Sequence, residues 1–247
     1  MTFQINNKIA VVTGANRGIG LAIVQSFLKH GAKKVYLAVR NTDSVQSLVE
    51  QYGSRVEPVQ VDVADPAAIK NLAAQTTDAD VVVNNAGVLK SADVLDPTAE
   101  DALNFELNIN TFGLLRMAQA YQPILADKEK AAFVQLNSVA SIKNFAPFTT
   151  YSASKAAAYS LTQGLKDSWA DHNIQVLSVH PGPIATDMAN EAGMSEGADP
   201  AELVSEGIVE ALQSGQFHLF PDTMAKDFET QYHDYAVNIV EPLPESN

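Results

Sequence analysis

Short apolar segments with the character of buried strands alternate with helical patterns along almost the entire chain of 247 residues. We predict strands at residues 8–13, 35–39, 56–61, 80–83, 132–136, 174–179 and 217–220. The longest helical patterns span residues 66–75, 98–108, 111–125, 151–169 and 201–214. Apolar strands that alternate with helices form parallel sheets covered by helices on both faces. The sequence therefore predicts a single α/β domain, residues 1–247, built on a doubly wound parallel sheet.

The first predicted strand runs directly into a glycine-rich turn, which reads GANRGIG from residue 14 to residue 20, and a helical pattern follows. Gly14 allows a tight turn, Gly18 lets the backbone approach a pyrophosphate, and Gly20 allows close packing of helix and strand. A strand, a glycine-rich turn and a helix in this order form a phosphate-binding arrangement. The spacing G-x-x-x-G-x-G differs from the commoner G-x-G-x-x-G. From glycine spacing alone, a purely structural turn is the alternative.

The end of the second predicted strand indicates which dinucleotide the turn would bind. An acidic residue there, about 20 positions after the last glycine, binds a ribose 2′-hydroxyl, whereas an arginine suits a 2′-phosphate. Arg40 follows this strand directly, and Arg17 lies inside the glycine-rich turn. Two arginines that converge on one anion favour bidentate phosphate recognition. The sequence thus favours NADP(H) over NAD(H), and the alternative is that both arginines are simply solvated.

Polar or glycine-containing motifs follow the carboxyl ends of several predicted strands. These ends are marked by Gly14, Arg40, Asn84, Ser138 and Pro181. In a doubly wound sheet, ligands bind in the crevice beyond the carboxyl ends of the strands. We therefore expect these five positions to surround one ligand site.

Tyr151 and Lys155 are four residues apart in a segment with the composition of a helix. Residues at this spacing lie on the same helix face, about 5–6 Å apart at Cβ. An ammonium beside a phenol favours the phenolate, so we expect the pKa of Tyr151 to fall below its ordinary value. Such a tyrosine can exchange a proton with an alcohol or ketone oxygen. On spacing alone, an ordinary surface pair is the alternative.

Taken together, these motifs resemble the short-chain dehydrogenase/reductase family in its short single-domain form, over essentially the full length of the chain. The matching motifs, in order, are Thr13-Gly14-x-x-x-Gly18-Ile19-Gly20, Asn84-Asn85-Ala86-Gly87, Asn110 three residues before Gly113, Ser138 thirteen before Tyr151, Tyr151-x-x-x-Lys155, and Pro181-Gly182. The resemblance implies a Rossmann fold. Many members have two consecutive serines where this chain has Asn137-Ser138, and Ser138 keeps the position that carries the chemistry.

The resemblance implies a role for each of four catalytic candidates. Tyr151 looks like the general acid that protonates the carbonyl oxygen, and Ser138 like the donor that holds that oxygen. Lys155 would lower the pKa of Tyr151 and hold the nicotinamide ribose. Asn110 would anchor a water that connects Lys155 to solvent.

The glycine-rich turn, the two arginines and the resemblance also give a set of cofactor contacts. Within it, Asp62 and Val63 are expected beside the adenine, Asn85 and Gly87 beside the adenosine ribose. The full set is Gly14, Asn16, Arg17, Gly18, Ile19, Gly20, Arg40, Asp62, Val63, Asn85, Ala86, Gly87, Tyr151, Lys155, Pro181, Gly182, Ile184 and Thr186.

Charge and composition exclude several classes of protein. A net charge of −13, from 16 basic and 29 acidic side chains, repels nucleic acid, acidic lipid and acidic carrier proteins. The chain has no cysteine, no apolar run of membrane-spanning length and no signal peptide, so we expect a cytoplasmic protein without membrane or nucleic-acid partners. Its five histidines lack metal-ligand spacing, so we expect no metal and no zinc alcohol dehydrogenase.

We expect an NADPH-dependent carbonyl reductase that is reversible as an alcohol dehydrogenase. The alternatives are a 3-oxoacyl carrier-protein reductase and a nucleotide-binding regulatory protein without catalysis. An acidic carrier needs a basic patch, yet no Lys or Arg occurs between residues 175 and 217. The expected pocket wall is apolar and suits a neutral, moderately hydrophobic ketone or aldehyde. It comprises Val88, Leu89, Ile142, Phe145, Pro147, Phe148, Pro183, Met188 and Met194.

Two further expectations concern mobility and assembly. Residues 185–200 combine glycines and methionines with polar residues, which favours a mobile substrate lid over an ordinary disordered connection. The helices at 111–125 and 151–169 should share one face of the sheet and leave Ala157, Leu161 and Leu165 for another subunit. The aromatic segment 217–240 should add a second interface. With the family resemblance, this favours a homotetramer over a dimer.

Overall fold

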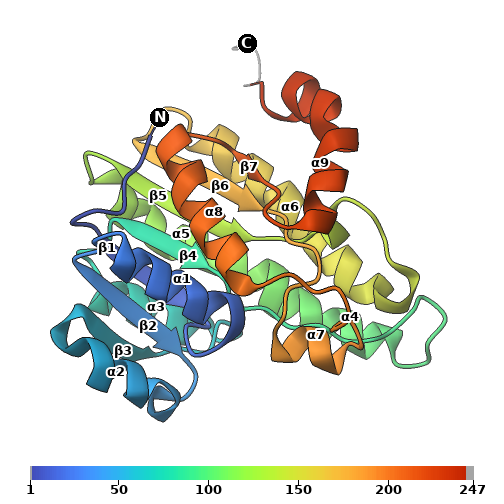
Figure 1. The fold of residues 1–247 in the computed structure, drawn as a ribbon, viewed down its shortest axis with the longest axis horizontal. Helices are drawn as coiled ribbons and strands as arrows, with labels where there is room; N and C mark the ends of the chain where they lie inside the picture. The colour runs from blue at the N-terminus through green and yellow to red at the C-terminus, as the bar shows by residue number, and fades with distance from the viewer. Residues whose placement is uncertain (1, 243–247) are drawn as a thin grey trace.

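The computed structural model describes residues 2–242, which form a three-layer α/β arrangement (Figure 1). Its central sheet is parallel, with strand order β3-β2-β1-β4-β5-β6-β7. The strands are β1 (Ile9–Thr13), β2 (Lys34–Val39), β3 (Val56–Gln60), β4 (Val81–Asn84), β5 (Ala131–Leu136), β6 (Ile174–Val179) and β7 (His218–Leu219). The predicted doubly wound sheet is confirmed, and the strand ends lie within one residue of those predicted.

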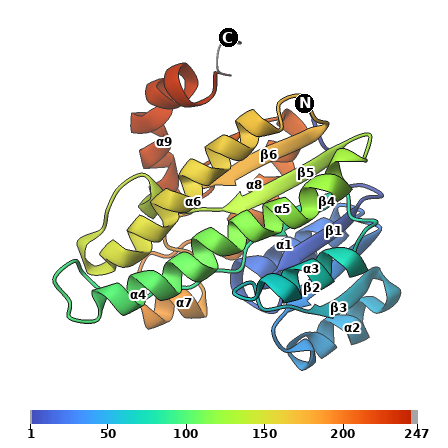
Figure 2. The same ribbon diagram turned by 180° about the vertical axis from the view of Figure 1, so that it is seen from behind.

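The helices cover both faces of this sheet, as Figures 1 and 2 show from opposite sides. The α-helices are α1 (Gly18–Lys29), α2 (Gln46–Tyr52), α3 (Pro66–Gln75), α4 (Ala99–Glu106), α5 (Phe112–Ala126), α6 (Thr149–Ser168), α7 (Asp187–Glu191), α8 (Ala201–Ser214) and α9 (Thr223–Tyr235). Short 3-10 turns occupy Thr42–Val45, Gly53–Arg55, Val139–Ser141 and Ala146–Phe148, and wider π-turns occupy Leu107–Thr111 and Ala236–Val240.

The sheet separates two hydrophobic clusters because successive strand side chains point to opposite faces. On β1, Val12 packs into the cluster under α1 and α8, whereas Val11 packs into the cluster under α3, α5 and α6. Neither valine has exposed surface. Each fully buried valine stabilises the fold by about 1.5–3 kcal/mol relative to an exposed one. Among residues 2–242, no helix has the length and apolarity needed to cross a membrane.

The crevice of this fold opens where the strand order reverses. β1 pairs with β2 on one side and with β4 on the other, so the chain crosses over in opposite directions from this point. Ligands of doubly wound sheets bind beyond the carboxyl ends of such strands. The turn after β1 and the segment after β4 therefore face each other across the crevice.

Four features differ from the sequence-based expectation. The helices α2, α7 and α9 were not predicted, because the first two are short and the third was interpreted as an aromatic tail. α4 and α5 are joined by the π-turn Leu107–Thr111, where a break between two helices was expected. A π-turn keeps the chain helical while it widens by one residue, and such turns are frequent at functional sites.

Candidate active site and cofactor cleft

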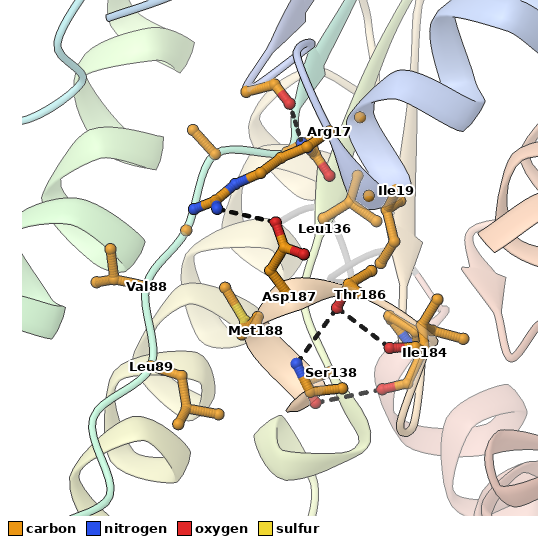
Figure 3. Close-up of a pocket in the computed structure, with 18 of the residues that line it drawn as sticks. Arg17, Ile19, Val88, Leu89, Leu136, Ser138, Ile184, Thr186, Asp187 and Met188 are labelled. Atoms are coloured by element: carbon orange, nitrogen blue, oxygen red, sulfur yellow. Dashed lines mark hydrogen bonds and ion pairs between the residues drawn. The ribbon is translucent and has the colours of Figure 1, made fainter. Parts of the chain in front are cut away.

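A cavity of about 980 Å³ lies at the carboxyl edge of the sheet, between the strand ends and the segment that contains α7. Figure 3 shows part of its wall, with Arg17 and Asp187 on one side and Ser138 on the other. All predicted catalytic and cofactor-binding residues except Asn110 line this cavity. They are Gly14, Asn16, Arg17, Gly18, Ile19, Gly20, Arg40, Asp62, Val63, Asn85, Ala86, Gly87, Ser138, Tyr151, Lys155, Pro181, Gly182, Ile184 and Thr186. Of the five positions at strand ends, Asn84 does not line it, because its side chain is buried and its amide donates to the Gln135 side-chain oxygen at 2.7 Å.

The glycine-rich turn has a shape that side chains would obstruct. Gly14 and Gly18 have φ angles of 66° and 53°, in the left-handed region that favours glycine. A Cβ on Gly20 would lie 2.1 Å from the Gly14 carbonyl oxygen. The turn therefore brings backbone close to the cavity at the N-terminus of α1, as a pyrophosphate site requires. These residues fit a dinucleotide.

Hydrogen bonds between β1 and β4 hold the turn in place. The Thr13 hydroxyl oxygen accepts from the backbone N–H groups of Asn85 and Ala86, each at 2.9 Å. The Asn85 side-chain amide donates to the Thr13 carbonyl oxygen at 2.8 Å. The residues after β4, Asn85 and Ala86, line the cavity and at the same time hold Thr13, which directly precedes the glycine-rich turn.

The two arginines line the cavity at the end near β2 and the glycine-rich turn, with Asn41 and Ser44 beside Arg40. Arg17 forms an ion pair with Asp187, the first residue of α7, at 3.0 Å (Figure 3). Their side chains are 64% and 59% exposed, so this pair contributes little to stability. Sequence reasoning missed Asp187, Asn41 and Ser44. The pair of Arg17 and Asp187 joins positions 170 residues apart, for which the sequence carries no local signal.

Ser138, Tyr151 and Lys155 come together at the opposite end of the cavity. The Lys155 ammonium is buried, donates to the Leu136 carbonyl oxygen at 2.7 Å and lies 5.8 Å from the centre of the Tyr151 ring. Ser138 caps the turn after β5: its hydroxyl oxygen accepts from the Ala140 N–H at 3.1 Å. The same hydroxyl donates to the Pro181 carbonyl oxygen at 3.2 Å. The helix α6 presents Tyr151 and Lys155 on one face, as their spacing predicted.

The expected lowering of the pKa of Tyr151 is wrong for this structure. Burial disfavours the phenolate and raises the pKa of Tyr151 to about 12, although a hydrogen bond with Ser138 acts in the opposite direction. Burial also lowers the pKa of Lys155 to about 8. Desolvation is the largest cause of both shifts: it disfavours the charged form of each group, the Tyr151 phenolate and the Lys155 ammonium. Tyr151 is therefore a protonated phenol that can donate a proton.

Asn110 lies behind the cavity wall, in the π-turn between α4 and α5. Its side-chain oxygen accepts from the Val88 N–H, and its amide nitrogen donates to the Val88 carbonyl oxygen and the Ser154 hydroxyl, all at 2.9 Å. A Cβ on Gly87 would lie 3.2 Å from the Asn110 oxygen and 3.6 Å from the Lys155 nitrogen. Asn110 thus braces the segment after β4 and lies close to Lys155.

The cavity beyond Ser138 and Tyr151 has a largely apolar wall. Seven of the nine predicted wall residues line it: Val88, Leu89, Phe145, Phe148, Pro183, Met188 and Met194. Ile142 does not, because it packs against the separate cluster around Val139 and Phe220, and Pro147 is also outside the cavity lining. These two assignments are wrong.

Met224, at the start of α9, joins the wall and was missed because α9 was not predicted. Asp222 fixes its position: this buried carboxylate accepts from the Gly182 N–H at 2.8 Å and the Ala225 N–H at 3.1 Å. Burial raises the pKa of Asp222, and these hydrogen bonds partly offset the effect. The C-terminal helix is thereby anchored to the Pro181-Gly182 turn.

Backbone hydrogen bonds join the two ends of the segment 185–200, which was predicted to be a lid. Ala185 N–H donates to the Asp199 carbonyl oxygen at 2.8 Å, and Asp199 N–H donates to the Pro183 carbonyl oxygen at 3.1 Å. Between these points, Thr186 caps the N-terminus of α7. In the described residues there is no group of three or more side chains that could hold a metal ion.

Comparison with known proteins identifies the family. The family model described as short chain dehydrogenase matches residues 8–197. A protein named "Oxidoreductase UcpA" from Salmonella typhimurium is 30% identical over 263 residues, which cover 98% of this chain and 97% of that protein. A protein of Schizosaccharomyces pombe named "NADP-dependent 3-hydroxy acid dehydrogenase" is 28% identical over 195 residues, 75% of each chain.

A crystal structure of a short chain dehydrogenase from Burkholderia cenocepacia J2315 in complex with NADP gives a TM-score of 0.87. It is 29% identical and covers 97% of this chain and 100% of that one. The match of the family model, the full-length relative and the shared fold agree with the six motifs in the sequence. This chain belongs to the short-chain dehydrogenase/reductase family of oxidoreductases.

Proposed function

We propose that the protein reduces a ketone or aldehyde to an alcohol with NADPH, and that it also runs the reverse oxidation. The observation that carries this proposal is the convergence of Ser138, Tyr151 and Lys155 on the cavity that the glycine-rich turn lines. A site for a dinucleotide and a proton donor for a carbonyl oxygen therefore share one space. That combination suits hydride transfer coupled to proton transfer.

Each catalytic side chain has a task in this reaction. The nicotinamide supplies the hydride when the cofactor is bound. Ser138 turns its hydroxyl hydrogen from the Pro181 carbonyl oxygen to the carbonyl oxygen of the substrate and stabilises the developing charge there. Tyr151 gives the phenolic proton to the same oxygen, and the Lys155 ammonium stabilises the phenolate that this leaves. Because the pKa of Tyr151 is about 12, the protonated phenol that reduction needs is the prevailing form of this side chain near neutral pH. Oxidation needs the phenolate, which forms only at a higher pH.

Asn110 would serve the return of the proton to Tyr151 through Lys155. Both hydrogens of its side-chain amide are already donated, to Val88 and to Ser154. A water of the proposed relay would therefore be held by an oxygen atom of Asn110. In this proposal Asn110 supports the cavity wall through its hydrogen bonds with Val88 and also accepts a hydrogen bond from the water.

The proposed cofactor is NADP(H). Its support is the presence of Arg17 and Arg40 at one end of the cavity, without a carboxylate at the end of β2. The Burkholderia relative binds NADP, and the yeast relative is named as NADP-dependent. In this assignment Arg17 and Arg40 hold the 2′-phosphate, and Arg17 leaves Asp187 to do so.

The proposed substrate is neutral and moderately hydrophobic. Phenylalanine and methionine side chains form much of the substrate end, and Glu196 adds negative charge from the lid. Asp187 pairs with Arg17 toward the other end. Among the described residues that line the cavity, the basic ones are Arg17, Arg40 and Lys155, all assigned to cofactor or catalysis. This leaves no basic patch for an acidic carrier protein, which disfavours 3-oxoacyl carrier-protein reduction. The presence of Ser138, Tyr151 and Lys155 disfavours a purely regulatory protein.

The proposed function is tested by NADPH oxidation with a broad panel of ketones and aldehydes. We expect turnover with one or more apolar carbonyl compounds, detected by the loss of NADPH absorbance and by the alcohol product. The control variant Tyr151→Phe keeps the ring and removes one hydroxyl, so it should bind NADPH but not turn over. If wild type binds NADPH yet reduces no compound of the panel, the regulatory alternative replaces this proposal.

We also propose that residues 185–200 act as a lid over the bound substrate. The hydrogen bonds among Pro183, Ala185 and Asp199 hold the two ends of the segment in place, so that the residues between them can move as a lid. Met188 and Met194 of this segment line the cavity. Methionine side chains repack easily around ligands of different shape. The ion pair of Arg17 and Asp187 would hold the lid against the glycine-rich turn in the free protein.

For the assembly we propose a homotetramer, with a dimer as the alternative. A groove between α5 and α6 is lined by leucines and small residues, which suits a helix pair from another subunit: Leu114, Leu115, Ser160, Leu161, Gly164, Leu165 and Ser168. Of the aromatic residues expected to form the second interface, Phe228 and Tyr232 are partly buried against the cluster around Val139 and Phe220, and Tyr235 is exposed. Light scattering that gives a mass near 26.5 kDa would contradict the proposal.

A further inference from the structure

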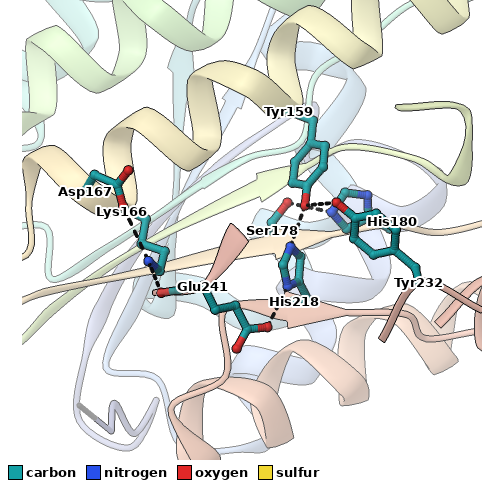
Figure 4. A network of polar contacts seen from close by, with 8 residues as sticks. All are labelled: Tyr159, Lys166, Asp167, Ser178, His180, His218, Tyr232 and Glu241. Carbon is teal, nitrogen blue, oxygen red and sulfur yellow. Dashed lines mark hydrogen bonds and ion pairs between the residues drawn. The ribbon is translucent and has the colours of Figure 1, made fainter. Parts of the chain in front are cut away.

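His180 is a fully buried histidine directly behind the catalytic turn, and none of the proposed steps uses it. Its ring is held on two sides: it stacks on Phe220 with ring centres 5.1 Å apart, and the edge-to-face ring of Tyr159 lies 4.6 Å away. Figure 4 shows His180 close to Ser178 and Tyr159, within a network of polar contacts. A ring confined in this way can fix the position of the groups to which it hydrogen-bonds.

The hydrogen bonds around His180 determine which ring nitrogen carries the proton. Nδ1 lies 3.2 Å from the Ser138 carbonyl oxygen, which can only accept, and 3.0 Å from the Ser141 hydroxyl. Ser141 already donates its hydroxyl hydrogen to the Ser138 carbonyl oxygen, so it must accept from His180. Nδ1 is therefore the protonated nitrogen. Burial lowers the pKa of His180 to about 3, so the ring is neutral and Nε2 is an acceptor.

Ser178 and Asn137 complete the arrangement on the other side of the ring. The Ser178 hydroxyl lies 2.7 Å from Nε2 and therefore donates to it. The same Ser178 oxygen accepts from the Asn137 side-chain amide at 2.9 Å, which leaves its hydrogen free for His180. The Asn137 amide also donates to the Thr162 hydroxyl oxygen on α6 at 3.2 Å. Asn137 is the residue that departs from the serine pair common in the family.

This chain of hydrogen bonds leads to Ser138, the residue that is proposed to donate a hydrogen bond to the substrate oxygen. The Ser138 carbonyl oxygen accepts from His180, from the Ser141 hydroxyl and from the Ser141 N–H, the last at 2.9 Å. The Ser138 hydroxyl belongs to the same turn and is oriented by Ala140 and Pro181. If the carbonyl group rotates, the turn rotates with it and the hydroxyl changes direction. A misplacement of about 1 Å can cost roughly 100-fold in rate.

We propose that His180 is a positioning residue for catalysis: its Nδ1–H holds the Ser138 carbonyl group, and Asn137 and Ser178 fix its tautomer, so that the Ser138 hydroxyl faces the substrate oxygen. The inference rests on the proposed function, because it needs Ser138 to act on the substrate. It adds His180, Ser178 and Asn137 to the residues on which that action depends.

The first test compares kcat and KM in two variants of His180. His180→Phe keeps a ring and removes both nitrogens, whereas His180→Asn restores a donor near the position of Nδ1. We expect His180→Phe to lower kcat about tenfold or more with the KM for NADPH unchanged, and His180→Asn to recover part of the loss. His233→Phe, at an exposed position of α9, is the matched control and should behave as wild type. Wild-type kcat in His180→Phe would overturn the inference.

A double-mutant cycle with Ser138→Ala then separates positioning from general damage. Removal of one donor to a developing oxyanion typically costs about 100–1,000-fold in kcat, so residual turnover is measurable. If His180 acts through Ser138, His180→Phe in the Ser138→Ala background should add no further loss. Additive losses would overturn the inference and leave the proposed function intact. Wild-type kcat in Ser138→Ala would instead overturn the role of Ser138 in the proposed function, and the inference with it.

The tautomer can be tested without a destabilising substitution. Nitrogen-15 NMR of wild type with labelled histidine, with the His180 signals assigned by their absence in His180→Asn, should show His180 neutral with the proton on Nδ1 between pH 6 and 9. In Ser178→Ala the acceptor Nε2 loses its donor, so the Nδ1–H population should fall. An Nε2–H tautomer of His180 in wild type would overturn the proposal even if His180→Phe does not fold.

Discussion

Replacement of Gly20 by alanine should damage the cofactor cleft far more than the rest of the fold. The new Cβ would lie 2.1 Å from the Gly14 carbonyl oxygen and 2.6 Å from the Asn85 amide nitrogen, whereas ordinary contact begins at 3.4 Å. The glycine-rich turn or the start of α1 must therefore move by about 1 Å. Overpacking of this kind costs about 1–3 kcal/mol, which lowers Tm by roughly 2–12 °C in a domain of this size. A displacement of about 1 Å in the phosphate site should reduce kcat/KM for NADPH by roughly 100-fold.

The assay measures thermal unfolding without cofactor, NADPH binding by fluorescence titration, and kcat/KM for NADPH. Gly207→Ala is the matched control, because its Cβ would meet only the Leu219 methyl groups at 3.3 and 3.4 Å and the Pro221 side chain at 3.7 Å, away from the cavity. The control should bind NADPH as wild type does. If Gly20→Ala binds NADPH within about twofold of wild type, the glycine-rich turn does not hold the cofactor as argued.

Three further predictions concern charge. Arg40→Asp should raise the KM for NADPH at least about tenfold and leave NADH use intact or improved, since each charge-assisted hydrogen bond contributes roughly 1.5–3 kcal/mol; equal use of NADH by wild type would contradict the assignment. Asp187→Asn should lower the KM for NADPH by up to about fivefold, because it frees Arg17 from an exposed ion pair of about 0.2–1 kcal/mol; an unchanged or higher KM would exclude this competition. The rate of reduction should fall as the pH rises through about 8, where Lys155 loses its proton. The free energy of unfolding should rise between about pH 8 and 10.5, because in this range the unfolded state binds more protons than the folded state. The pH profiles of kcat and Tm check both signs.

The sequence alone predicted the sheet and most of the cleft because both depend on local patterns. Each strand is a short apolar run, and the residues after the strands meet at one edge for topological reasons. The helix that follows the glycine-rich turn and the spacing of Tyr151 and Lys155 are also local features. Hence the positions of Gly14 and Ser138 in one cavity followed from the order of strands along the chain, whereas the family resemblance assigned Tyr151 to the same site.

The features that were missed depend on contacts between distant segments. The helix α9 has a local signal, since Phe228 and Tyr232 are four residues apart and Asp222 caps its start, but its place over the cavity depends on the bond from Asp222 to Gly182. The pKa of Tyr151 is set by burial, which the spacing to Lys155 cannot reveal. His180 likewise became a candidate only when the structure placed it behind Ser138.

The central claim is that hydride passes from NADPH to a carbonyl carbon while Tyr151 protonates the oxygen. We would supply NADPH that carries two deuterium atoms at C4 of the nicotinamide, together with a carbonyl compound that wild type reduces, and analyse the alcohol by mass spectrometry. The account predicts one deuterium on the carbinol carbon for wild type, and no product from Tyr151→Phe although it binds NADPH. An alcohol without deuterium, or labelled alcohol formed by Tyr151→Phe at the wild-type rate, would contradict it.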